Sequence, residues 1–115
     1  MDVLELFAAT LQPLPWPATQ PPGDSQAATY LTFNETSWTT PESSSNAARR
    51  RRHLVQLHAI TTGSDGEHRE ALRQAIDLLR AAGVRVYAGG PDNYETDTRR
   101  HHIACTCEYW EKITE

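Results

Sequence analysis

The segment from residue 91 to residue 107 concentrates the side chains that most often carry chemistry. Seven of its seventeen residues are Asp, Glu, His or Cys, namely Asp92, Glu95, Asp97, His101, His102, Cys105 and Cys107. Such side chains could hold a metal ion, supply a nucleophile or exchange protons as paired carboxylates. Alternatively, they belong to a polar turn that leads into a strand, and the surrounding elements decide between these possibilities.

A metal site in this segment would have to use His101, Cys105 and Cys107. Side chains alternate along a strand, so His102 falls on the opposite face. The three remaining residues are strung along one strand, whereas zinc ligands usually converge from two separate elements. The pattern favours two small buried thiols and two exposed imidazoles. We therefore expect no metal and no other cofactor.

Catalysis is not favoured by this segment either. A catalytic thiolate needs a partly exposed, activating setting, but Cys105 and Cys107 fall in the middle of a strand on its apolar face. Glu95 and Asp97 stand beside two arginines, where solvated ion pairs are the ordinary outcome. No glycine-rich phosphate loop occurs in the chain. The sequence predicts no catalytic residues and a protein that is not an enzyme.

Composition places the chain among soluble globular proteins. It has 115 residues with 11 basic and 15 acidic side chains, a net charge of −4. This length suits a single domain, residues 1–115, with a modest core. The acidic balance argues against a general nucleic-acid binder. No apolar run resembles a signal peptide or a membrane span, and two cysteines one residue apart do not form a disulfide framework. We expect a cytosolic origin.

Periodicity and turn signals predict an α+β domain. The predicted elements are, in order, a short helix 2–11, strands 28–34 and 53–61, a longer helix 67–82, and strands 84–88 and 101–110. Several prolines between residues 12 and 26 predict an extended crossing. We expect a mostly antiparallel or mixed sheet of about four strands, with the main helix packed on one face and the short N-terminal helix beside it.

The two predicted helices carry clear signals. Asp2 with Glu5, and Ser64 with Glu67, have the spacing of capping boxes, and Gly83 supplies a stop signal. The expected buried stripe of the first helix is Val3, Phe7 and Leu11. The expected buried stripe of the second helix is Leu72, Ala75, Ile76, Leu79 and Ala82.

Residues 36–52 are predicted to form one long mobile loop. The segment holds one large apolar residue, Trp38, and ends in a basic run, Arg49, Arg50, Arg51 and Arg52. Long loops in small domains are usually functional or disordered. We expect Trp38 to anchor a partner, and the four arginines to dock on acidic protein surface. The basic run could instead be a solvated loop end, or serve a small RNA-binding domain, although the strands lack an aromatic stacking pattern.

Several stretches together resemble a known family, the small tail-terminator or tail-completion proteins of long-tailed bacteriophages and prophages. The residues that carry the resemblance are Leu14-Pro15-Trp16-Pro17, Tyr30 to Asn34, the helix from Ala71 to Gly83, Tyr94-Glu95-Thr96-Asp97-Thr98, His102, Tyr109 and Trp110. The match spans most of the chain in order and spacing. The run Arg49–Arg52 departs from the family pattern.

The resemblance implies a structural virion protein at the head–tail junction. Its implied partners are further copies of itself in a ring, generally sixfold, the tail tube protein and the head connector. It implies no catalysis and no cofactor, with assembly in the bacterial host cytoplasm and a final place in the virion tail or neck. Under this interpretation, residues 92–98 are a turn that positions the last strand.

Three other interpretations remain open. One is another neck protein, such as a stopper or connector. Another is a small metal-dependent enzyme that uses His101, Cys105 and Cys107. The third is the RNA-binding α+β domain mentioned above. We expect no membrane association and no sequence-specific binding of nucleic acid.

Overall fold

The computed structural model describes residues 2–21, 27–38, 49–87 and 89–113. Its elements are, in order, α1 (Val3–Leu11), β1 (Ala18–Thr19), β2 (Thr29–Trp38), β3 (Arg49–Thr61), α2 (Glu67–Ala81), β4 (Arg85–Val86), β5 (Asn93–Glu95) and β6 (Arg100–Ile113). In the described part of the chain, neither helix has the length and apolar character needed to cross a membrane.

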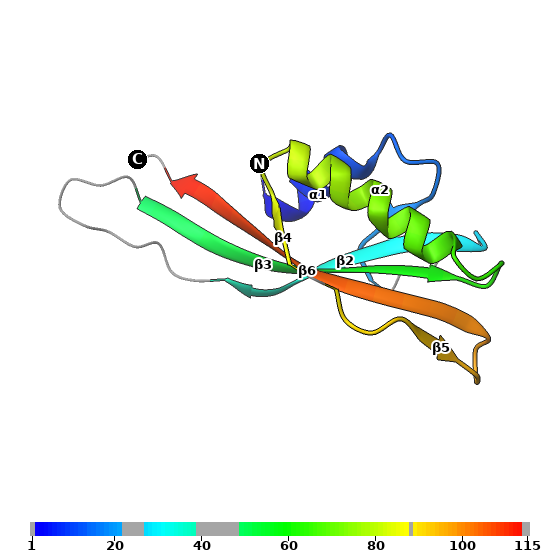
Figure 1. Ribbon diagram of the computed structural model, residues 1–115. Coiled ribbons are helices and arrows are strands. Elements are labelled where there is room, and N and C mark those ends of the chain that lie inside the picture. Colours follow the sequence, from blue (N-terminus) through cyan, green and yellow to red (C-terminus); the bar gives the residue numbers. More distant parts are fainter. Residues whose placement is uncertain (1, 22–26, 39–48, 88, 114–115) are drawn as a thin grey trace.

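The strands form one mixed sheet, and both helices cover the same face of it (Figure 1). The order is β1-β2-β3-β6-β4, with β5 paired to β6. Among the described strands, only the pair β1 and β2 is parallel. The predicted α+β class is confirmed. The sheet has six strands instead of about four, because two short strands form within the predicted proline crossing and the predicted turn.

The core lies between the helices and the covered face of the sheet. Its buried members are Val3, Phe7 and Leu11 of α1, Leu31 and Phe33 of β2, Val55, Leu57 and Ala59 of β3, Ala71, Leu72, Ala75 and Leu79 of α2, Val84, and Cys105 and Cys107 of β6. The rings of Phe7 and Phe33 pack with centroids 5.8 Å apart. The predicted burial of Cys105 and Cys107 on one face of β6 and the predicted stripe of α1 are confirmed.

The buried stripe of α2 begins earlier than the sequence predicted. His68 and Ala71 are fully buried, whereas Ile76 is half-buried and Ala82 is exposed. The observed stripe follows the helical period through positions 68, 72, 75 and 79, so Ile76 falls on its flank. The predicted burial of Ala82 was wrong. Gly83 ends the helix as expected, at a φ of 91° that favours glycine.

Neither predicted capping box forms. Asp2 and Gly66 are the N-cap residues, and neither makes a side-chain capping bond. The carboxylate of Glu67 instead accepts a hydrogen bond of 2.9 Å from the hydroxyl of Thr29, next to the buried hydroxyl of Thr61. The carboxylate therefore accepts hydrogen bonds from buried hydroxyls of β2 and β3. The spacing of residues near Glu67 could not predict these long-range contacts.

Three strands continue past the helices as an extension that we call the arm, residues 35–38, 49–54 and 108–113 (Figure 1). The predicted loop 36–52 was therefore wrong at both ends, and only its residues 39–48 lie outside the described residues. A β-bulge between Glu35 and Ser37 lets β2 continue along β3. The molecule is elongated, with extents of 53 × 25 × 23 Å.

The predicted turn at residues 92–98 contains a strand. Residues 93–95 form β5 and pair with residues 100–102 of β6, so the turn itself occupies residues 96–99. Arg99 takes a left-handed conformation with φ 54°. The segment does position the last strand, and it does so by pairing with that strand.

Candidate functional site

The two cysteines lie where strand alternation predicted. Both are buried, unpaired by a disulfide, and beneath the helices. A hydrogen bond with Cys105, together with burial, raises the pKa of the Cys107 thiol. A thiol held neutral is a poor nucleophile and a poor metal ligand. His102 lies on the opposite face of β6, so it does not join the cysteines.

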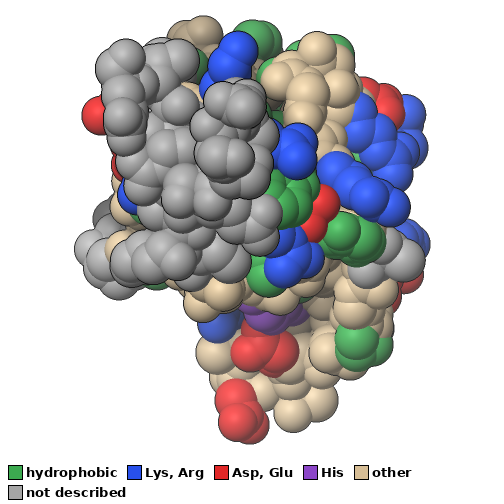
Figure 2. Space-filling view, turned by 90° about the vertical axis from the view of Figure 1, so that its left-hand side faces the viewer, with side chains coloured by type: hydrophobic (Ala, Val, Ile, Leu, Met, Phe, Trp, Pro, Cys, Tyr) green, Lys and Arg blue, Asp and Glu red, His purple; other side chains and the backbone are tan. Residues whose placement is uncertain are grey.

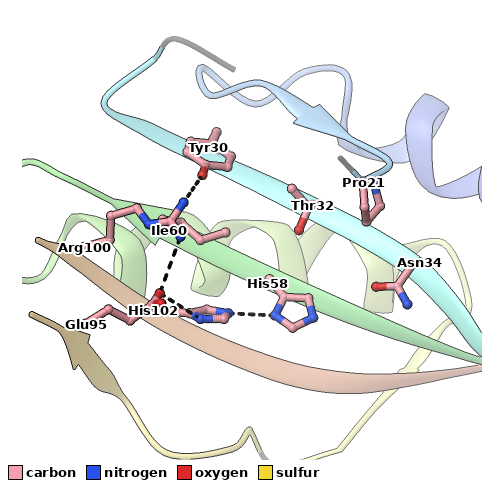
Figure 3. A pocket seen from close by; sticks show the side chains of 9 residues that line it. All are labelled: Pro21, Tyr30, Thr32, Asn34, His58, Ile60, Glu95, Arg100 and His102. Carbon is pink, nitrogen blue, oxygen red and sulfur yellow. Dashed lines mark hydrogen bonds and ion pairs between the residues drawn. The ribbon is translucent and has the colours of Figure 1, made fainter. Parts of the chain in front are cut away.

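The uncovered face of the sheet carries a pocket of about 300 Å³ near the paired ends of β5 and β6 (Figure 3). It is lined by Pro21, Tyr30, Thr32, Asn34, His58, Ile60, Glu95, Arg100 and His102. All of these side chains except Pro21 come from β2, β3, β5 and β6, where alternation points every second residue away from the helices. The pocket is therefore a product of the sheet register.

A chain of polar contacts runs through this pocket from Glu95 to His102 to His58 (Figure 3). The carboxylate of Glu95 lies 3.5 Å from Nδ1 of His102, and Nε2 of His102 lies 2.7 Å from Nδ1 of His58. A carboxylate accepts hydrogen bonds, which favours the hydrogen on Nδ1 of His102. His102 Nε2 then accepts a hydrogen bond from His58 Nδ1–H. This leaves the lone pair of His58 on Nε2.

The charges in the pocket nearly balance at neutral pH. Burial, together with the electrostatic effect of the neighbouring His102 ring, lowers the pKa of His58, so the His58 ring is neutral. Arg100 donates a hydrogen bond of 3.0 Å to the hydroxyl of Tyr30 and lies 3.9 Å from Glu95. The pocket can accept a proton through His58. Among the described residues, its lining includes no Ser or Cys, and its hydroxyl groups are those of Tyr30 and Thr32.

The arm carries the described part of the basic run, and each described arginine of the run has a partner side chain within the chain. Arg51 lies 3.8 Å from Glu111, and Arg52 forms a hydrogen-bonded ion pair with Glu108. The guanidinium of Arg50 stacks 5.1 Å from the ring centroid of Trp110. The side chains of Trp38 and Arg49 lie outside the described residues. Cross-strand acidic partners thus let a run of four arginines form a strand.

Figure 2 views the arm end-on, and Lys and Arg side chains lie there beside acidic and hydrophobic ones. His53 contacts two carboxylates, with Nε2 at 2.9 Å from Glu111 and Nδ1 against Glu35. Burial opposes the charged ring, but these hydrogen bonds outweigh it and raise the pKa of His53. A hydrogen bond from Arg52, working against burial, lowers the pKa of Glu108.

The two perturbed histidines predict opposite dependences of stability on pH. The folded-state pKa of His53 is raised above its usual value of 6.5, so its stabilisation is complete below pH 6.5 and is lost as the pH rises through the folded-state pKa. The folded-state pKa of His58 is lowered from the same value, so stability falls as the pH drops from 6.5 through the folded-state pKa.

We expect H53Q to lose most stability at acid pH and H58Q to lose most at neutral pH. Urea unfolding of wild type and both variants from about pH 5 to about pH 8 measures this difference. Equal slopes for the two variants would contradict the assigned environments. H58Q keeps a polar side chain of similar size in the pocket. It therefore removes the titrating imidazole without leaving a cavity.

Comparisons with known proteins identify the fold. No family model matches the sequence, and no curated protein matches it. A chain in the solved structure of the virion of a native gene transfer agent particle matches with a TM-score of 0.65 and 16% identity. The match covers 94% of this chain and 85% of that chain. The two chains therefore share one fold over nearly their whole lengths.

Sequence reasoning missed the pocket, although one signal for it was present. The mixed second face of β3, with Gln56 and His58 between apolar residues, indicated an uncovered sheet face. Which residues of β2 and β6 lie across from His58 depends on register. Register requires pairing partners that a single strand does not specify.

Proposed function

We propose that this protein is a structural component of a phage-like or prophage virion that acts at the head–tail junction, where it caps the tail tube and joins it to the head connector. The observation that carries the proposal is the fold shared with a virion chain over 94% of this chain. The sequence resemblance to tail-terminator proteins, at residues such as Tyr94 to Thr98 and His102, supports the junction in particular.

In this proposal the working form is a ring of copies, and the arm contacts the neighbouring copy. Trp110 lies on the arm with 41% of its surface exposed, stacked against Arg50. Trp and Arg are among the residue types most enriched at interface hot spots. Trp38 and the run Arg49–Arg52 extend the same contact, with acidic surface of the next copy as their counterpart.

The arm suits a contact that depends on ionic strength. Arg51 and Arg52 already have acidic neighbours in the same chain, and interface formation would rearrange these pairs without burying unpaired charges. Rim charges of this kind guide association more than they strengthen it. Moderate contacts repeated around a ring then add up through multivalency.

The proposal is tested by deleting the gene in the strain that produces the particles and examining lysates by electron microscopy. We expect filled heads and unattached tails, with joining restored when the intact gene is returned. Tails of irregular length would indicate the capping role, because an uncapped tube continues to grow. Normal tails with heads that lose their DNA would indicate a stopper-type neck protein instead. Wild-type particle yield without the gene would overturn the proposal.

A further inference from the structure

A cluster of metal-ligand side chains lies on the covered side of the molecule, away from the pocket. Asp65 precedes α2, His68 is in the first turn of α2, and His101 is in β6. One donor atom from each residue lies within 4.8 Å of the other two. The three converge from two places in the fold, the start of α2 and β6, which the cysteine-based arrangement lacked.

His68 is prepared as a ligand by its own contacts. It is fully buried, and its Nε2 lies 2.6 Å from a carboxylate oxygen of Asp92. A carboxylate accepts hydrogen bonds, so Nε2 carries the hydrogen and the lone pair of the neutral ring sits on Nδ1. Among the described residues, Nδ1 of His68 has no hydrogen-bond partner. A carboxylate behind an imidazole whose other nitrogen is free is the arrangement found around metal-bound histidines.

One pair of donor atoms is already near the spacing of a bound ion, and the set spans at most 4.8 Å. Ligands about 2.1 Å from zinc in a tetrahedral arrangement are about 3.4 Å from one another. Nδ1 of His101 already lies 3.6 Å from Oδ1 of Asp65. The rings of His101 and His68 stack with centroids 5.1 Å apart, so His101 must turn out of this stack to share an ion. Its side chain is 23% exposed and that of Asp65 is 63% exposed, which leaves both able to move.

Arg69 is the cation that competes with a metal ion for Asp65, and its ion pair with Asp65 is weak enough to be displaced. Nη1 of Arg69 lies 3.1 Å from Asp65 and 2.5 Å from Asp92. The pair with Asp65 is exposed on both sides, and such pairs contribute little to stability. Arg69 can keep its contact with Asp92 while Asp65 turns to an ion.

We propose that Asp65, His68 and His101 form a zinc site, with Asp92 as the residue that positions His68. Two imidazoles and one carboxylate suit Zn²⁺ and disfavour Mg²⁺ and Ca²⁺, which prefer oxygen ligands. Three protein ligands leave the fourth position to water. The ion would tie the start of α2 to β6. This site shares only His101 with the cysteine-based set that the sequence argued against.

Zinc binding is measured by isothermal titration of ZnCl₂ into chelator-treated full-length protein, with MgCl₂ as the comparison. We expect one Zn²⁺ per chain, no binding of Mg²⁺, and a higher melting temperature with zinc. H101A and D65N should each weaken binding at least tenfold, and D92N by about tenfold through His68. In imidazole NMR spectra, the Nδ1 signal of His68 should shift on addition of zinc.

Matched controls separate this site from adventitious binding. H102A removes the adjacent imidazole on the opposite face of β6, and D97N removes an exposed carboxylate in the turn before it. Both should bind zinc as wild type does. Absence of binding by wild type would overturn the proposal, as would equal losses in the controls, or unchanged affinity in H101A and D65N. These variants avoid replacing the buried His68, whose loss could prevent folding.

Discussion

Replacing Leu79 by Ala is expected to lower the free energy of unfolding by about 2–5 kcal/mol. Leu79 is 0% exposed and lies within the core cluster between α2 and the sheet. Its truncation removes apolar contacts and leaves a cavity that close-packed neighbours fill only in part. Urea or thermal unfolding of the full chain measures the change.

Ile76 provides the matched control on the same helix. The sequence pattern ranked Ile76 with Leu79 as a buried residue, but the structure leaves Ile76 half-buried on the flank of α2. We expect I76A to cost roughly 1 kcal/mol, well below the cost of L79A. Equal losses in the two variants would mean that α2 is rotated about its axis relative to the structure described above.

The elements that the sequence predicted well are those whose neighbours along the chain decide their structure. The alternation Val55, Leu57, Ala59 identifies β3, and the stop at Gly83 depends only on local backbone conformation. Burial on one face of a strand is fixed by a two-residue period, so the core side of β6, with Cys105 and Cys107, could also be predicted.

The elements that the sequence missed depend on partners far along the chain. Arg49 to Arg52 do not look like a strand until Glu108 and Glu111 stand across from them in β6. The carboxylate of Glu67 was predicted to cap α2, yet it serves the hydroxyls of two strands. Short strands such as β1 and β5 have too few residues for any periodicity, and pairing alone defines them.

The candidate sites divide in the same way, into features that the local sequence predicts and features that depend on residues far along the chain. Strand alternation alone separates His102 from the cysteines, and the structure confirms that separation. The contact between His58 and His102 needs the register of β3 against β6, and the cluster of Asp65, His68 and His101 needs α2 to lie over β6. Contacts between polar residues of different elements therefore cannot be predicted from the pattern of a single strand.

Replacing Trp110 by Ala is expected to weaken self-association by about 30-fold, the effect of losing an interface hot spot of about 2 kcal/mol. Trp110 is 41% exposed on the arm, and the guanidinium of Arg50 lies 5.1 Å from its ring centroid. A large ring left this exposed in the free chain gains most from burial by a neighbouring copy. The stacking of its ring with the guanidinium of Arg50 is also lost, so stability should fall by about 1 kcal/mol or less.

Analytical ultracentrifugation at several salt concentrations measures the association, and electron microscopy of particles produced with each variant measures head–tail joining. Y94A is the matched control, because Tyr94 is 52% exposed on β5, which pairs with the opposite end of β6. We expect Y94A to associate as wild type does. W38A and a deletion of residues 39–48 should resemble W110A, folding normally yet failing to join tails. If W110A assembles at wild-type strength while remaining folded, the arm is not the contact between copies, and the ring must form through another surface.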